Sequence, residues 1–70
     1  MLDELKNGDW IETGNRIYEV ASNEGEFLYA REVEYMSDFP KLRYGKPTRL
    51  NKCELARNGY EITEKEISND

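Results

Sequence analysis

Hydrophobic and polar residues mix over two short runs near the start of the chain, Trp10–Thr13 and Arg16–Ala21. Both runs are rich in the β-branched and aromatic residues that favour strands, so two strands are predicted. The pair Gly14 and Asn15 between the runs is typical of a two-residue hairpin loop, and glycine in the first loop position predicts a type II′ turn. Ahead of this hairpin, Leu2–Lys6 is expected to form one helical turn that lies on the body as a flap.

A longer run, Glu26–Tyr35, changes the face on which its hydrophobic residues fall. Leu28 and Ala30 share one face, whereas Val33 lies on the other. A long strand of this kind is expected to bend around a small barrel.

Glycine and proline predict turns on both sides of this strand. Ser22–Gly25 is expected to be the turn before it. Met36–Pro47 contains two prolines and a glycine, so an irregular, exposed loop is expected there, with brief pairing at residues 42–44 as the alternative.

Signals for a short helix gather over residues 52–58. Asn51 is a favourable N-cap, and Glu54 three residues later completes a capping box. Gly59 is expected to end the helix in the left-handed conformation. Leu50 lies one residue before the cap, where it can form a hydrophobic staple with a leucine inside the helix.

The helix is too short to be stable alone, so it must dock on the body through Leu55. A last strand is predicted over residues 60–63. Residues 1–63 therefore form one small domain, and residues 64–70 form a polar C-terminal tail. The fold class is mainly β: a small antiparallel barrel or curled sheet of four to five strands with one short C-terminal helix.

The spacing of turn and capping residues along the chain resembles that of known proteins. Leu5-x-x-Gly8-Asp9 leads into a strand, a hairpin, a long third strand and a late helical turn, and this order resembles small SH3-like barrel modules. The spacing from Pro47 through Leu55 to the Gly59–Tyr60 pair is similar to that of short phage-type and prophage-type proteins. The resemblance implies an SH3-like barrel or curled sheet and a mobile-element origin, and it transfers no functional residues.

A chain of 70 residues has room for one small core, and self-association into a homo-oligomer would support it. The sequence contains neither a run of 18 apolar residues nor a signal-peptide pattern, so no membrane contact is expected. Cys53 is the single cysteine, which excludes an intrachain disulfide and favours a reducing, cytoplasmic setting.

Charge is divided unevenly along the chain, whose formal net charge is −5. Residues 1–40 carry ten acidic and three basic side chains, whereas residues 41–57 carry six basic side chains and one acidic. One interpretation is that the two signs face each other in the fold and improve solubility. The other is that one of the two charged regions contacts a partner.

Two partner-binding interpretations follow, with a structural or assembly subunit as a third. In the first, a face of acidic strands binds a basic surface of another protein, as a phage-type inhibitor of a host protein would. Its residues are Glu12, Glu19, Glu32 and Glu34. In the second, a basic segment with an aromatic residue contacts nucleic acid, although a pI near 4.7 argues against that partner. Its residues are Lys41, Arg43, Tyr44, Lys46 and Arg49.

Catalytic chemistry finds little support in the residue types. Histidine is absent, so a cysteine nucleophile has no conventional base. Cys53 is therefore expected to be a semi-buried structural residue. One cysteine and scattered carboxylates provide no metal-ligand set and no cofactor motif. The sequence predicts a non-enzymatic protein.

Overall fold

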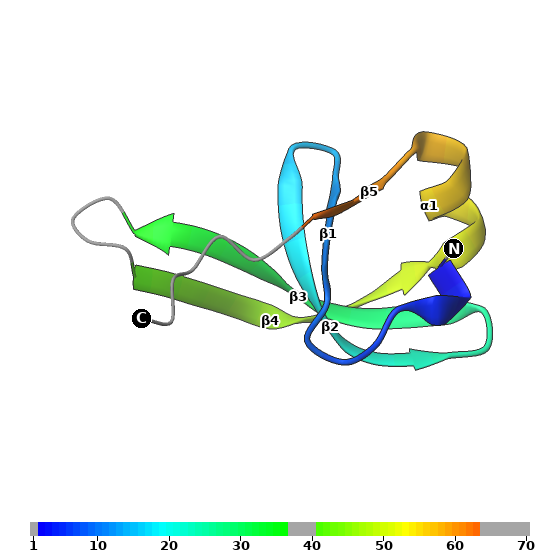
Figure 1. The fold of residues 1–70 in the computed structure, drawn as a ribbon, viewed down its shortest axis with the longest axis horizontal. Coiled ribbons are helices and arrows are strands. Elements are labelled where there is room, and N and C mark those ends of the chain that lie inside the picture. Colours follow the sequence, from blue (N-terminus) through cyan, green and yellow to red (C-terminus); the bar gives the residue numbers. More distant parts are fainter. Residues whose placement is uncertain (1, 37–40, 64–70) are drawn as a thin grey trace.

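A computed structural model describes residues 2–36 and 41–63 of the chain. Five antiparallel strands form one sheet in the order β4-β3-β2-β1-β5, with β4 and β5 at its edges (Figure 1). The elements are η1 (Leu2–Glu4), β1 (Trp10–Thr13), β2 (Arg16–Glu24), β3 (Phe27–Met36), β4 (Lys41–Asn51), α1 (Lys52–Asn58) and β5 (Glu61–Thr63). The mainly β prediction is confirmed in its second form, because the sheet is curled and does not close.

The first hairpin joins β1 to β2 through Gly14 and Asn15, as predicted. Its turn type differs from the prediction. The φ angle is 58° at Gly14 and 67° at Asn15, and positive φ at both loop residues is the pattern of a type I′ turn. Asparagine is one of the few residues other than glycine that tolerates this conformation, so the sequence accommodates the type I′ geometry.

The second hairpin joins β2 to β3 and is tighter than predicted. Glu24 pairs with Phe27, so the loop contains Gly25 and Glu26 alone, and β2 continues through most of the expected turn. Gly25 has a φ of 56°. Because Glu26 has no positive φ, this is the hairpin that has the type II′ pattern.

Strand β3 buries opposite faces at its two ends, which confirms the predicted change of face. Leu28 and Ala30 are fully buried on one face, and Val33 is 5% exposed on the other. Each neighbouring strand has an extra residue: the pairing shifts between Val20 and Ser22 in β2, and again in β4 opposite the step from Arg31 to Val33. Bulges of this kind increase the local twist, and the sheet bends there.

The prediction of an irregular loop is wrong for Met36, which ends β3, and for residues 41–47, which belong to β4. The alternative of pairing at residues 42–44 is confirmed, and the pairing extends well beyond them. Pro47 pairs with Arg31, and an edge strand tolerates proline because one side of its backbone has no neighbouring strand. Gly45 lies in the bulge opposite Glu32. Residues 37–40, including the predicted loop residue Phe39, lie outside the described residues, and so does the predicted tail 64–70.

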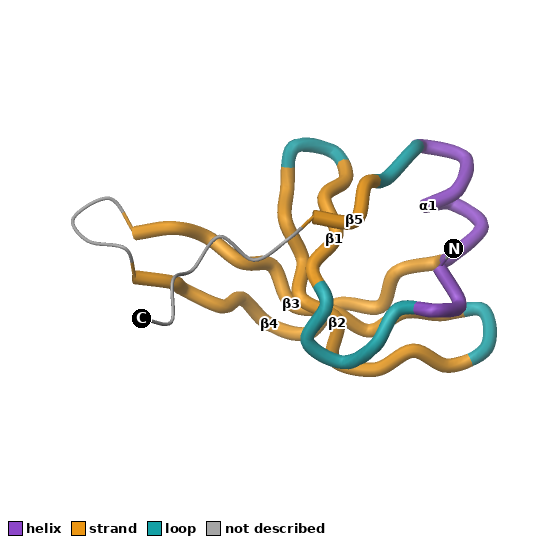
Figure 2. The backbone as a smooth tube through the Cα atoms, viewed as in Figure 1, coloured by secondary structure: helices purple, strands orange, loops and turns teal. Residues whose placement is uncertain are grey.

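Elements η1 and α1 lie on the same side of the sheet (Figure 2). The hydrophobic core lies on the face of the sheet that they cover. The predicted N-terminal turn is confirmed as a 3₁₀ helix whose leucine is buried. The buried residues of the hydrophobic core are Leu2, Leu5, Ile11, Val20, Leu28 and Leu55. Tyr18, Leu50 and Tyr60 pack against them. The side-chain amide of Asn23 donates hydrogen bonds to the carbonyls of Leu2 (2.9 Å) and Leu5 (3.0 Å), and so fastens η1 to β2.

Helix α1 begins and ends where the sequence predicts. The Oδ1 atom of Asn51 accepts hydrogen bonds from the backbone N–H groups of Cys53 (2.9 Å) and Glu54 (3.2 Å). Within residues 2–36 and 41–63, the Glu54 carboxylate has no hydrogen bond or ion pair, so the capping box is half formed. Gly59 donates to the Leu55 carbonyl (2.9 Å). Its φ of 93° is positive, as predicted, but its ψ of 143° lies far from the left-handed helical value.

Replacement of the cap residue tests how much this helix depends on it. Asn51→Ala is expected to lower the free energy of unfolding by about 1 kcal/mol, because two backbone donors lose their acceptor. Asn51→Asp is the matched control, since aspartate also accepts at this position. Urea denaturation of the three proteins checks the expectation, and equal stability of all three would contradict it.

Candidate functional site

The predicted acidic face divides between the two sides of the sheet. Its members are Glu12, Glu19, Glu32 and Glu34. The first two lie on the face that carries Trp10, and the last two lie on the face that carries Tyr18, because directly paired residues share a face. The structure therefore does not gather the four carboxylates into one surface.

Basic side chains lie next to two of these glutamates. The guanidinium of Arg16 is 3.7 Å from the carboxylate of Glu32. Arg43 lies directly opposite Glu34 in the pairing of β3 with β4. Opposite charges in cross-strand positions favour the interpretation that these charges match each other at the surface. A role for Glu32 and Glu34 in partner binding remains a prediction.

Glu19 has a structural contact that the sequence did not indicate. Its carboxylate oxygen Oε1 accepts a hydrogen bond from the indole Nε1–H of Trp10 (2.8 Å) and one from the hydroxyl of Tyr44 (3.4 Å). Trp10 is 2% exposed, and a buried indole N–H needs an acceptor. Glu19 therefore fixes the tryptophan and one residue of β4 on the same side of the sheet.

The predicted basic segment lies along β4 and also divides between its faces. The residues are Lys41, Arg43, Tyr44, Lys46 and Arg49. Tyr44 and Arg49 share the face of Arg31, Arg43 lies on the opposite face, and Lys46 is in the bulge. The side chain of Lys41 lies outside the described residues.

Aromatic and arginine side chains alternate on the face of β3 and β4 that points away from the core. We call Phe27, Tyr29, Arg31, Tyr44 and Arg49 the arginine–aromatic strip. The guanidinium carbon of Arg49 lies 4.5 Å from the ring centroid of Phe27, and that of Arg31 lies 5.9 Å from the ring centroid of Tyr44. Tyr29 and Tyr44 are 37% and 44% exposed. The strip therefore presents rings and guanidinium groups together to solvent.

Sequence reasoning found two residues of this strip, Tyr44 and Arg49, and missed the three contributed by β3. Their signal was present in the alternation of Phe27, Tyr29 and Arg31 opposite the buried Leu28 and Ala30. It could not be joined to β4 because the bulge sets the register between the two strands.

The environment of Tyr44 changes its acidity. Partial burial, the negative charge of Glu19 and the hydrogen bond to that carboxylate raise the pKa of Tyr44 above its ordinary value of 10.0, and the positive charge of Arg31 opposes the rise. The hydrogen bond that the phenol donates to Glu19 is thus one of the causes of the raised pKa of Tyr44.

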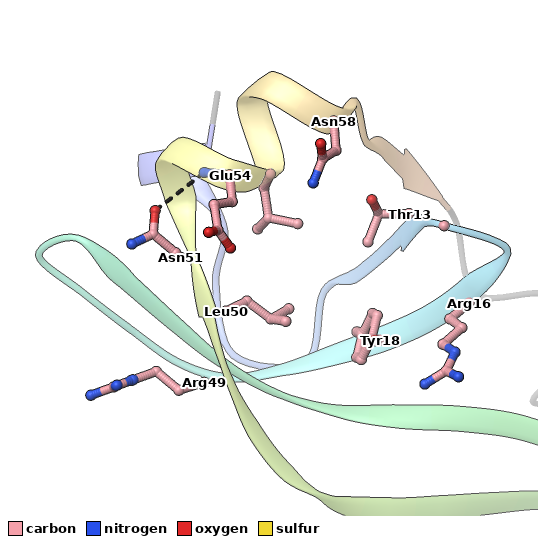
Figure 3. Close-up of a pocket in the computed structure, with 10 residues that line it drawn as sticks. Thr13, Arg16, Tyr18, Arg49, Leu50, Asn51, Glu54 and Asn58 are labelled. Carbon is pink, nitrogen blue, oxygen red and sulfur yellow. Dashed lines mark hydrogen bonds between the residues drawn. The ribbon is translucent and has the colours of Figure 1, made fainter.

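A cleft of about 470 Å³ opens between the first hairpin, the end of β4 and helix α1 (Figure 3). It is lined by Thr13, Gly14, Arg16, Tyr18, Arg49, Leu50, Asn51, Glu54, Leu55 and Asn58. Tyr18 and Leu50 lie below the space, and Glu54 and Asn58 reach down toward it from α1, whereas Arg16 and Arg49 point away (Figure 3). The sequence did not indicate this site, because its walls come from segments far apart in the chain.

Cys53 is exposed, so the expected semi-buried position is wrong. The short helix α1 turns Leu55 toward the core, and Cys53, two residues earlier, lies on a different side of the helix. Among the described residues, no three cysteine or carboxylate side chains gather where they could hold a metal ion. No helix in the described parts of the chain is long and apolar enough to cross a membrane.

No protein-family model, curated protein or solved structure matches this chain.

The contact between Glu19 and Tyr44 can be tested by titration. Glu19→Gln removes the negative charge but keeps an acceptor, so the pKa of Tyr44 is expected to fall toward 10.0. The tyrosine Cζ chemical shift followed against pH by NMR measures it. Glu34→Gln, on the other face, is the control. An unchanged pKa in Glu19→Gln would show that the carboxylate does not reach the phenol.

Proposed function

We propose that this chain is a non-enzymatic binding module that docks on another protein through the arginine–aromatic strip. The observation that carries the proposal is the arrangement of three rings and two guanidinium groups on one exposed face of β3 and β4. Tyrosine and arginine are enriched at the energetic centres of protein interfaces. Arg31 contacts Tyr44, and Arg49 contacts Phe27. Tyr29 lies directly opposite Arg49 in the pairing of β3 with β4.

The strip is partly organised before any partner arrives. The contacts of Arg49 with Phe27 and of Arg31 with Tyr44 restrain two long side chains that are otherwise mobile. The hydrogen bond from Tyr44 to Glu19 fixes a third side chain. Ordering side chains in advance lowers the entropy cost of association, which favours binding through this face.

The charge of the strip indicates the kind of surface it would meet. Its two arginines favour a partner patch with carboxylates or carbonyl oxygens, which guanidinium groups bind with well-defined geometry. The ion pair of Arg16 with Glu32, and the position of Arg43 directly opposite Glu34 in the strand register, make the opposite face less suited to a purely electrostatic contact. We therefore place the working surface on the strip and not on the four predicted glutamates.

Single-stranded nucleic acid is the second candidate, because bases stack on aromatic side chains beside cations. Two arginines in a chain with a net charge of −5 give a weak attraction for phosphates, so the protein partner is favoured. The resemblance to phage-type proteins supports a cytoplasmic role in which the module covers and inhibits a surface of a host protein.

Paired substitutions in the strip test the proposal. Tyr29→Ala with Arg31→Ala is expected to weaken partner binding about tenfold or more, because both side chains leave the centre of the contact. Thr48→Ala with Arg43→Ala is the matched control: it removes one arginine and one neutral residue from the opposite face of the same two-stranded hairpin. Capture from a bacterial lysate after nuclease treatment, with immobilised protein, provides the measurement, and circular dichroism checks the fold.

Three outcomes would contradict the proposal. Loss of all captured material after nuclease would favour nucleic acid as the partner. Loss of binding in Glu32→Lys with Glu34→Lys, while the strip variant still binds, would favour the acidic residues. Equal binding by the strip variant and its control would exclude the strip.

A further inference from the structure

The cleft between the first hairpin and α1 has walls that hold their shape. Tyr18 and Leu50 pack against the core, and Leu55 is buried in it. The hydroxyl of Thr13 donates a hydrogen bond of 2.8 Å to the carbonyl of Gly59, which joins the hairpin to the end of the helix. The cleft is therefore a property of the folded chain and does not need a mobile loop to form it.

Three charged side chains line this cleft, and two of them have partners. Arg16 is paired with Glu32, and Arg49 lies over the ring of Phe27. Figure 3 shows both arginines directed away from the space. The carboxylate of Glu54 hangs toward Leu50 and has no hydrogen bond or ion pair within the described residues. Glu54 is therefore the charged side chain directed into the cleft, and its charge is negative.

An aromatic ring completes the set of groups that suits a cation. Tyr18 lies on the floor of the cleft with its ring beside Leu50 (Figure 3). Aromatic faces attract ammonium and guanidinium groups, and apolar side chains pack against the aliphatic stems that carry them. A carboxylate, an aromatic ring and two leucines therefore offer one contact to each part of a lysine or arginine side chain.

We propose that the cleft binds a basic side chain, lysine or arginine, presented by a second protein. The aliphatic stem lies between Tyr18 and the leucines, and the charged head meets the carboxylate of Glu54. The acidic balance of the whole chain attracts a basic partner to the site. A volume of about 470 Å³ has room for such a side chain and part of the backbone that carries it.

This site is independent of the proposed docking surface. Arg49 is the one residue common to both, and its guanidinium lies on the strip side, over Phe27. An anionic occupant would need the guanidinium of Arg16 or Arg49 to leave its present contact. A cationic occupant uses the Glu54 carboxylate, which has no hydrogen bond or ion pair within residues 2–36 and 41–63. The cation is therefore the better match.

Small-molecule probes test the proposal with the full chain. n-Butylguanidinium and n-butylammonium reproduce the ends of arginine and lysine, and butyrate is the probe of opposite charge. In ¹⁵N–¹H NMR titrations, both cations are expected to shift the amide signals of Tyr18, Leu50 and Glu54 in a saturable way. Butyrate is expected to leave these signals unchanged.

A pair of charge-matched variants identifies the carboxylate. Glu54→Gln is expected to weaken cation binding about fivefold, the scale of an exposed ion pair. Glu24→Gln removes the same charge at the exposed end of β2, away from the cleft, and is expected to bind as the native chain does. The strip variant Tyr29→Ala with Arg31→Ala is also expected to bind the probes normally, which separates this test from that of the docking surface.

The proposal fails if Glu54→Gln binds the cations as tightly as the native chain. Equal weakening in Glu24→Gln would overturn it as well, since the effect would then come from net charge alone. Shifts of the same three amides by butyrate, with none by the cations, would assign the cleft to an anion.

Discussion

The architecture depends on one strand that must bury opposite faces at its two ends. Leu28 and Ala30 of β3 point toward η1 and α1, whereas Val33 points to the other side of the sheet. A flat sheet that is covered on one face alone would bury one of these sets and expose the other, because side chains alternate strictly along a strand. Extra residues in β2 and β4 solve the conflict by bending the sheet beside β3.

The same bend produces the two candidate surfaces. Where Leu28 and Ala30 turn inward, Phe27, Tyr29 and Arg31 turn outward, so the burial of one set exposes the other. The curl also stands the β1–β2 hairpin opposite α1 (Figure 1). The cleft lies between these two elements and the end of β4. The strip and the cleft are therefore consequences of how this small core is enclosed.

Patterns among neighbouring residues predicted most elements of the fold. Strand register and packing between distant segments determine the strip and the cleft. The first hairpin, the change of face in β3 and the limits of α1 could all be read from neighbouring residues, because turn chemistry, alternation and capping act over a few positions. Strand β4 was hidden by Pro47 and Gly45, which an edge position and a bulge accommodate. The position of Glu34 opposite Arg43 depends on register. The Glu54 carboxylate, which has no partner among the described residues, takes its position from packing between distant segments. Patterns among neighbouring residues could therefore not predict these features.

The walls of the cleft are positioned by polar contacts between distant segments of the chain. The strip needs no such contacts. Helices of one and two turns are unstable alone, so η1 and α1 take their positions from the core and from a few specific bonds. Lys52 on α1 forms an ion pair of 2.9 Å with Asp3 on η1, and Thr13 bonds to a carbonyl 46 residues later in the chain. The strip, in contrast, lies on two strands that pair directly along most of their length. Loosening of α1 would therefore open the walls around Glu54 while the rings and guanidinium groups of the strip kept their register.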